Sequence, residues 1–272
     1  MSVVLGIDAG GSTTKVAGFA QGGLIGTLQV RAADQVTSIY GAVGRFLLGQ
    51  GMALESVSEI FLTGVGASFM GGDIYGIPAR KTDEFQAIGF GGARLSGLES
   101  ALVVSLGTGS AFVRVSPGKA VHIGGSGVGG GSLLGLSSKL INLSDIEAIA
   151  AVAENGDLSK VDLSVREICG QEIPHLPPHT TASNFGKISS LASKGDMALG
   201  LINMVFQTVG MLAVFACLND PVKDVVITGS LTVLPQAKEV FDAISALYNI
   251  NFTIPRNAVF ATAIGAVYPR GD

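Results

Sequence analysis

The stretch Asp8-Ala9-Gly10-Gly11-Ser12-Thr13-Thr14-Lys15 decides the fold, because it joins two apolar, β-branched runs at residues 3–7 and 15–20. The pattern predicts a β-hairpin whose turn is rich in glycine and hydroxyl side chains. Such a turn lets backbone N–H groups and hydroxyls reach phosphate oxygens, and Lys15 adds a positive charge. Asp8, at the end of a buried strand, is placed to hold a hydrated magnesium ion. The alternative is an ordinary hairpin with Asp8 as a turn residue.

A second hairpin of the same kind begins near residue 101. An apolar run at residues 102–105 leads into Leu106-Gly107-Thr108-Gly109-Ser110, and another follows at residues 111–115. By itself this turn fits a simple hairpin as well as a phosphate site. The recurrence predicts two cognate halves, an N-terminal lobe at residues 1–98 and a C-terminal lobe at residues 99–272. The last helix, from residue 258, is expected to pack back toward the first lobe.

Two further glycine-rich stretches follow in the second half. Gly124-Gly125-Ser126-Gly127-Val128-Gly129-Gly130-Gly131-Ser132 precedes an apolar helix that ends near residue 140. A glycine loop at a helix N-terminus is suited to wrapping a phosphate, and a flexible surface loop is the alternative. Val225-Val226-Ile227-Thr228-Gly229-Ser230 is an apolar strand followed by a glycine and a hydroxyl.

Strands and helices alternate along the rest of the chain, which predicts an α/β fold. Asp34 is expected to cap a helix at residues 35–48, and Thr82 or Asp83 to cap a helix that begins near Glu84. Further strands are expected at residues 24–30, 60–62, 225–228 and 252–254, and further helices at residues 144–154, 184–193, 198–218 and up to 247.

The composition favours a globular cytoplasmic protein. The apolar fraction of 47% with only 14% charged residues argues against disorder. A formal net charge of −4 without a block of Lys or Arg argues against a nucleic-acid partner. Cys169 and Cys217 lie far apart without CxxC spacing, so we expect reduced, buried thiols and no zinc site. The N-terminus carries no basic segment and no cleavage signal, so no export is expected.

Residues 198–218 form a charge-free run long enough to cross a bilayer. Asn203, Gln207 and Thr208 lie near its centre, and no Lys/Arg bias flanks it. These features favour a buried helix, at a subunit interface, over a membrane helix.

Taken together, the two hairpins and the strand before Ser230 resemble the two phosphate loops and the adenosine motif of the actin/hexokinase-like ATPase superfamily. The stretch at residues 8–15 is neither a Walker A sequence nor a GxGxxG between a strand and a helix, which excludes the P-loop and Rossmann folds. The resemblance implies an α/β, duplicated actin-like (ribonuclease H-like) ATPase fold, with a nucleotide cleft between two lobes.

A narrower resemblance rests on seven motifs that follow one another over nearly the whole chain. They look like those of type II pantothenate kinases. The resemblance implies a homodimer that uses ATP and Mg²⁺ to phosphorylate pantothenate to 4'-phosphopantothenate, the first step of coenzyme A biosynthesis. The motifs are residues 8–15, Thr82-Asp83-Glu84-Phe85-Gln86-Ala87, Leu106-Gly107-Thr108-Gly109-Ser110, Gly129-Gly130-Gly131, Val161-Asp162-Leu163-Ser164-Val165-Arg166-Glu167-Ile168, Thr181-Ala182-Ser183-Asn184-Phe185-Gly186 and Ala261-Thr262-Ala263-Ile264-Gly265-Ala266.

By the same resemblance Glu84 is the catalytic base, since a primary alcohol that attacks a phosphoryl group needs a carboxylate to take its proton. A helix-capping Glu84, with Asp83 as the rival base, is the alternative. Asp8 is expected to hold the metal, through water. The residues expected to contact the nucleotide are Asp8, Ala9, Gly10, Gly11, Ser12, Thr13, Thr14, Lys15, Thr108, Gly130, Gly131, Ser132, Leu133, Leu134, Ile146 and Ser230. Those expected to contact the acceptor are Glu84, Thr108, Ser110 and His122.

His122 is the one departure from the family pattern, which usually has Arg at this place. Arginine offers a permanent charge and a forked set of donors, whereas histidine as a residue type is only partly protonated at neutral pH. His122 is therefore either a weaker substitute for Arg or a structural residue.

Two other functions stay open. One is an amino-sugar or other small-molecule kinase of the same superfamily. The other is a nucleotide-switched activator ATPase, for which a CxxC or paired cysteines would be expected to hold an iron–sulfur cluster. Cys169 and Cys217 do not provide that spacing.

Overall fold

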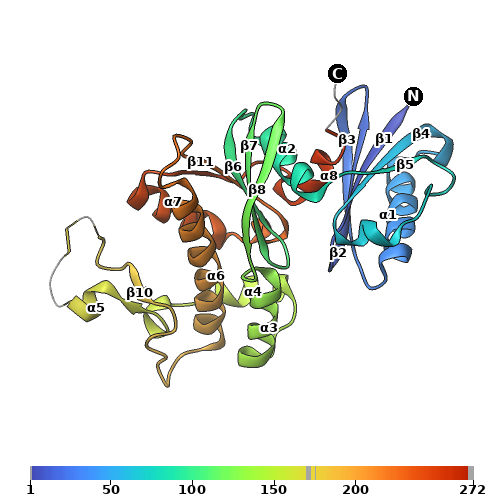
Figure 1. The fold of residues 1–272 in the computed structure, drawn as a ribbon. Helices are drawn as coiled ribbons and strands as arrows, with labels where there is room; N and C mark the ends of the chain where they lie inside the picture. Colours follow the sequence, from blue (N-terminus) through green and yellow to red (C-terminus); the bar gives the residue numbers. More distant parts are fainter. Residues whose placement is uncertain (1, 170–172, 175, 269–272) are drawn as a thin grey trace.

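The computed structural model describes residues 2–169, 173–174 and 176–268, and these residues form two five-stranded sheets (Figure 1). The first contains β1 (Val3–Ala9), β2 (Thr13–Ala20), β3 (Gly23–Arg31), β4 (Val57–Thr63) and β5 (Ala79–Lys81). Its order is β3-β2-β1-β4-β5. β2 pairs antiparallel with both β1 and β3, whereas β4 is parallel to both β1 and β5.

The second sheet repeats the first. It contains β6 (Ala101–Leu106), β7 (Ser110–Ser116), β8 (Lys119–Ser126), β11 (Asp224–Thr228) and β12 (Asn251–Thr253). Its order is β12-β11-β6-β7-β8, so β6, β7, β8, β11 and β12 take the places of β1 to β5. The antiparallel and parallel pairings also match strand for strand. The predicted duplicated α/β fold is thereby confirmed.

The helices begin and end close to the predicted residues, and two predicted caps are present. Asp34 accepts a hydrogen bond from the Thr37 N–H, and Asp83 accepts one from the Gln86 N–H. The helices are α1 (Gln35–Gln50), α2 (Glu84–Ser96), α3 (Gly130–Ile141), α4 (Ile146–Ala153), α5 (Val165–Cys169), α6 (Lys194–Cys217), α7 (Gln236–Tyr248) and α8 (Ala261–Gly265). Single 3₁₀ turns are η1 (Leu54–Ser56), η2 (Val65–Phe69), η3 (Leu158–Lys160), η4 (Ser230–Val233) and η5 (Ala258–Phe260), and β9 (Leu163–Ser164) pairs with β10 (Thr181–Ser183).

The inner strands of each sheet are buried on both faces, which explains why β1, β6 and β11 read as nearly continuous apolar runs. α1 packs on the outer face of the first sheet, and α6 and α7 pack on the outer face of the second. α2 and α8 lie between the sheets (Figure 1). α2 follows the first sheet in the chain but packs on the second sheet. α8, near the C-terminus, packs back on the first sheet.

Glycines bring α2 and α8 into backbone contact. A Cβ atom on Gly91 would lie 1.9 Å from the carbonyl oxygen of Ala261, and one on Gly265 would lie 1.9 Å from that of Ala87. Gly6 of β1 is equally tight, because its Cβ would lie 2.0 Å from the Ala263 carbonyl oxygen. No side chain fits at these three positions, so each glycine is needed for the close approach.

α6 is a core helix. A capping box at Ser193 and Asp196 starts it, and its apolar residues are central to the largest buried cluster. By length and composition it is the one helix of the described residues that could cross a membrane, but 61% of its apolar window is buried inside the protein. That burial is the expected property of the predicted buried helix.

Three predictions about local structure were wrong. Residues 184–193 are not a helix, because Phe185 takes a left-handed φ of 55° and donates its N–H to the buried Asp162 carboxylate. Gly124 to Ser126 are not part of a loop but extend β8, paired with β7. Cys169 is exposed, whereas Cys217 is buried as expected. The lobe boundary between residues 98 and 99 stays a prediction.

The glycine crossing gives a stability prediction. Gly91→Ala should destabilise the protein by about 1–3 kcal/mol, because the new methyl group must push α2 and α8 apart. The free energy of unfolding in urea measures it. Gly41→Ala is the matched control, since Gly41 is exposed in α1 with nothing within 4 Å of an added Cβ. It should stabilise by about 0.5–1 kcal/mol. Equal effects of the two substitutions would contradict the close-packing argument.

Candidate active site

The first hairpin places two opposite charges on the inner face of the first sheet. Asp8 of β1 and Lys15 of β2 are paired across the strands, and Lys15 Nζ lies 3.5 Å from Asp8 Oδ2. Less than a tenth of each side chain is exposed. A buried ion pair of this kind leaves the carboxylate with unused lone pairs, so it can still accept water or a ligand.

The rest of the hairpin divides between the tip and the opposite face. Gly11 and Ser12 are exposed at the tip. Thr14 is paired with Ala9, two residues before Val16, and Ala9 and Val16 both belong to the core under α1. The Thr14 side chain therefore points to the outer face, and only its backbone can reach a ligand beside Asp8.

The second hairpin and the glycine run form one unit. The Gly130 N–H donates to the Gly107 carbonyl oxygen and the Gly131 N–H to that of Thr108, both at 2.8 Å. A Cβ on Gly129 would lie 2.7 Å from the Gly109 carbonyl. Two of the N–H groups expected to wrap phosphate are therefore used to fix the hairpin on the start of α3.

The four glycine-rich stretches converge. A Cβ on Gly11 would lie 3.9 Å from Thr108 Oγ1, so the tips of the two hairpins face each other. Gly229, with a φ of 93°, packs on Leu106 at the start of the second hairpin, where its Cβ would lie 2.5 Å from the carbonyl oxygen. Ser230 follows directly. The predicted adenosine motif thus lies beside the second phosphate loop.

Glu84 begins α2 next to the first hairpin. Its carboxyl group is half-buried, and burial, followed by the negative charges of Asp8 and Asp83, raises its pKa above the usual value, while Lys15 opposes this. Asp83 is exposed and caps the helix. Glu84 is therefore the carboxylate that faces the Asp8–Lys15 pair, and Asp83 serves α2.

His122 lies beside this helix start. Its ring stacks on Phe85 with the ring centroids 3.8 Å apart and an angle of 15° between the planes. Because Phe85 follows Glu84 directly, the stack ties β8 to the predicted base. Sequence reasoning did not single out Phe85 as a partner, although it lies within the motif around Glu84.

The structure places the remaining candidates at different depths. Ser110 is buried, and Ser132 is half-buried and donates its hydroxyl to the Gly127 carbonyl oxygen. Leu133 is fully buried in the core, and Leu134 packs against it, so their side chains stabilise α3. Ile146 follows Asp145, whose carboxylate lies 3.3 Å from Arg31 at the end of β3.

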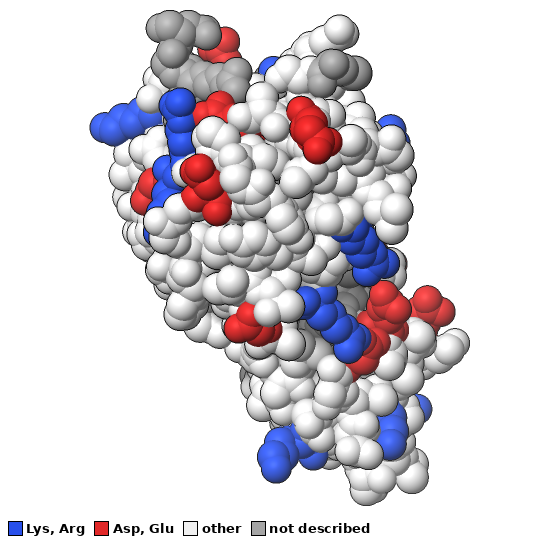
Figure 2. Space-filling view, turned by 90° about the vertical axis from the view of Figure 1, so that its right-hand side faces the viewer, with Lys and Arg blue, Asp and Glu red and all other residues white. Residues whose placement is uncertain are grey.

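That ion pair joins the first hairpin region to α4, since Arg31 is paired with Thr13. Figure 2 shows a hollow near the middle of one face, with both basic and acidic side chains at its rim. Exposed ion pairs contribute little stability, so we assign the contact to the arrangement of the two halves and not to the strength of the fold.

The residues present fit a hydrated magnesium ion. In the part of the chain that the structure describes, no group of three or more His, Cys, Asp and Glu could form a closed metal site. Mg²⁺ bound with nucleotides keeps several waters and uses one or two carboxylates together with phosphate oxygens. Asp8, which is paired with Lys15, is the single carboxylate that would meet this requirement.

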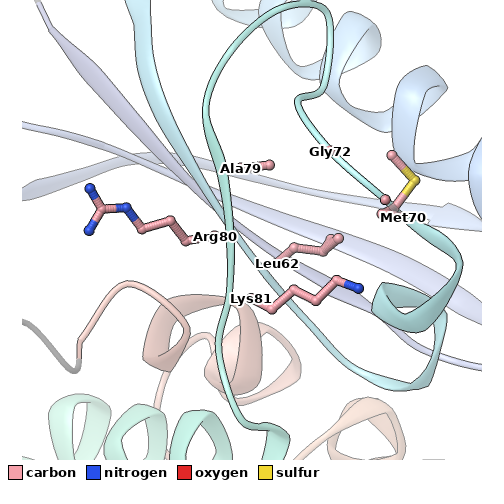
Figure 3. A pocket seen from close by; sticks show the side chains of 7 residues that line it. Leu62, Met70, Gly72, Ala79, Arg80 and Lys81 are labelled. Carbon is pink, nitrogen blue, oxygen red and sulfur yellow. The ribbon is translucent and has the colours of Figure 1, made fainter.

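A hollow of about 270 Å³ lies elsewhere, between β5 and the residues after η2. Figure 3 shows Leu62 and Lys81 pointing to the Met70 side, while Arg80 points away. Leu62 belongs to the core under α1, so this hollow is on the opposite face of β4 from Asp8. It contains none of the predicted site residues.

The motifs at residues 161–168 and 181–186, which narrowed the resemblance, contribute hydrogen bonds that hold the fold together. Asp162 is buried and accepts hydrogen bonds from Asn203 Nδ2 at 2.8 Å and from the Phe185 N–H at 2.9 Å. Asn184 and Thr181 add longer contacts. This network fastens residues 161–164 and 181–186 to α6, since a buried carboxylate requires such donors.

The duplicated sheets, the two facing hairpins and the turn at Gly229 define the actin/hexokinase-like ATPase fold. Solved structures agree on the fold. A dehydratase activator of Clostridium difficile with bound ADPNP has a TM-score of 0.68 at 16% identity, covering 97% of this chain and 92% of that one. The ROK hexokinase of Thermus thermophilus has a TM-score of 0.56 at 14% identity, covering 97% and 96%.

Sequence comparison identifies the family. Residues 98–260, more than half of the chain, match the Fumble family, and the protein belongs to it. A type II pantothenate kinase of Staphylococcus haemolyticus is 26% identical over 277 residues, covering 97% of this chain and 98% of the relative. One of Oceanobacillus iheyensis is 29% identical over 275 residues, with the same coverage.

Proposed function

We propose that the protein is an ATP-dependent pantothenate kinase, which forms 4'-phosphopantothenate in coenzyme A biosynthesis. The observation that carries the proposal is the half-buried Glu84 beside Asp8 and Lys15, where the two phosphate hairpins meet. Membership of the Fumble family and full-length relatives named type II pantothenate kinase support the acceptor.

The nucleotide lies between the hairpins in this proposal. N–H groups and hydroxyls of residues 10–13 face the phosphates from one side, and Thr108 faces them from the other. Lys15 places its positive charge beside them, and Ser230 contacts the nucleoside. These donors are fixed before binding, so they stabilise developing charge without reorganisation.

Glu84 accepts the proton of the acceptor's primary hydroxyl. The hydroxyl oxygen forms a bond to the γ-phosphorus, the bond to the β,γ-bridging oxygen breaks, and ADP leaves with that electron pair. Asp8 holds the hydrated Mg²⁺, which neutralises phosphate charge when bound. Ser110 and His122 orient the acceptor against Glu84.

The other functions are less well supported. The activator of similar fold is only 16% identical in sequence to this chain. A likeness at that level shows the fold alone. Cys169 is exposed and Cys217 is buried, and the two do not provide the paired thiols of a shared cluster. The relatives from Staphylococcus haemolyticus and Oceanobacillus iheyensis, which match over nearly the whole chain, are both named type II pantothenate kinase.

We also propose a cytoplasmic homodimer with lobes that divide between residues 98 and 99. Leu212 and Phe215 are exposed in the C-terminal half of α6, which is otherwise a core helix, and Leu218 is exposed directly after it. An apolar stripe on a core helix is suited to pairing with its own copy.

The test of the function couples ADP release to added pantothenate. The wild-type protein should release ADP with pantothenate and not with N-acetylglucosamine or without an acceptor. Glu84→Gln should lower turnover by about two to four orders of magnitude, the usual scale of general-base loss. Asp83→Asn, which keeps the helix cap, should remain near wild type.

The raised pKa of Glu84 adds a pH dependence. The base acts as a carboxylate, so kcat/KM should fall as the pH drops through its raised pKa, above the ordinary 4.5. Glu84→Gln should lack this acid limb. Turnover of Glu84→Gln within threefold of wild type would assign the proton to another group.

The His122 stack gives a second prediction. His122→Arg should keep kcat/KM for pantothenate at or above the wild-type value, whereas His122→Ala should lower it roughly tenfold or more. Phe85→Leu removes the stack and leaves the imidazole of His122. It therefore tests whether the position of that ring matters separately from its charge. Similar values for all variants would make His122 structural and leave Lys15 as the cation, since Arg114 is paired with Asp220 at the end of α6.

The dimer is tested by light scattering at micromolar concentration. Wild type should have the mass of two chains, and Phe215→Glu should have the mass of one, because a charge would be buried in the interface. Leu48→Glu is the control, since Leu48 is an exposed apolar residue of α1. A monomeric wild type would refute the interface and leave the kinase proposal standing.

A further inference from the structure

Thr63 is a buried polar residue for which the fold provides no partner. Its side chain is fully buried, and its hydroxyl oxygen has no hydrogen-bond partner among the residues that the structure describes. An unbonded buried hydroxyl is unfavourable, and a native protein that keeps one usually has a reason outside its packing.

The position of Thr63 is beside the charged pair of the first hairpin. It is the strand partner of Asp8, which in turn is the partner of Lys15. Phe61, two residues earlier, packs on the α8 side, so the Thr63 side chain points to the same inner face as the Asp8 carboxylate. The Thr82 N–H donates to the Leu62 carbonyl oxygen. Thr63 therefore lies between Asp8 and the segment that starts α2 at Glu84.

The backbone after Thr63 lies directly on the carboxylate. Gly64 has a φ of 86°, and a Cβ on it would lie 2.7 Å from Asp8 Oδ1. The chain thus turns away immediately after Thr63, at a position where any side chain would strike the carboxylate.

The duplicated half contains the same turn with a bonded hydroxyl. Thr228 ends β11, and Gly229 follows with a φ of 93°. The Thr228 hydroxyl donates to the Val104 carbonyl oxygen at 3.3 Å. Since the same strand end can bond its threonine within the fold, the turn geometry alone does not account for the unbonded hydroxyl of Thr63.

We propose that Thr63 is a positioning residue, whose hydroxyl bonds to a water of the magnesium–nucleotide complex held by Asp8. The inference rests on the proposed function, because it requires that complex to bind beside Asp8. Thr63 does not touch the transferred phosphoryl group. It acts by fixing the orientation of the water shell that Asp8 contacts.

The test compares Thr63→Val and Thr63→Ser in the full-length protein by thermal unfolding and nucleotide titration. Without ligand, Thr63→Val should raise the Tm by roughly 2–4 °C, since it replaces an unbonded hydroxyl by a methyl group. It should weaken binding of MgATP about tenfold and leave binding of ATP in EDTA unchanged. Thr63→Ser keeps the hydroxyl and should bind MgATP as wild type does.

Thr228→Val is the matched stability control and should lower the Tm, because it removes a bonded hydroxyl. A lower Tm for Thr63→Val without ligand would show that its hydroxyl is bonded within the protein and would overturn the proposal. Equal MgATP affinity of Thr63→Val and wild type would also overturn it. A wild-type protein that does not bind MgATP would refute the proposed function first, and this inference with it.

Discussion

The crossing of α2 and α8 is the contact on which the rest of the structure depends. Gly91 and Gly265 let the two helices meet backbone to backbone, and Gly6 lets α8 lie directly on β1. Because α2 packs on the second sheet and α8 on the first, this crossing fixes the distance between the sheets. Larger side chains would move the first hairpin away from Thr108, and the tips of the two hairpins would no longer face each other.

The two halves share a topology and divide the chemistry. Both end a central strand with Thr-Gly, and both glycines have φ near 90° and pack on the neighbouring hairpin strand. The first half adds the charges of Asp8 and Lys15, and α2 brings Glu84 to them. The second half adds the glycine-fixed start of α3 and the cradle at Ser230. The first half thus provides the charged side chains of the candidate site, and the second half provides its closely packed glycine turns from the opposite side.

Much of this arrangement could be predicted from the sequence, because local signals specify it. Apolar runs before Gly/hydroxyl turns predicted both hairpins, and Asp34 and Asp83 predicted two helix starts. The failures have non-local causes. Residues 184–193 look helical alone, but Asp162, 23 residues before Phe185, accepts the Phe185 N–H and bends them. The unbonded hydroxyl of Thr63 likewise depends on strand pairing, which its neighbours in sequence do not reveal.

Glu84 separates a kinase from a nucleotide switch of the same fold. A switch requires the phosphate hairpins and a closing motion, but no proton acceptor. Here Asp83 alone caps α2, so the stability of that helix does not require Glu84. Burial, followed by the negative charges of Asp8 and Asp83, raises the pKa of Glu84, and Lys15 opposes only part of this, so a charged carboxylate is unfavourable at this place. A carboxyl group held where its charged form is unfavourable is best explained by a reaction that needs a base at that place.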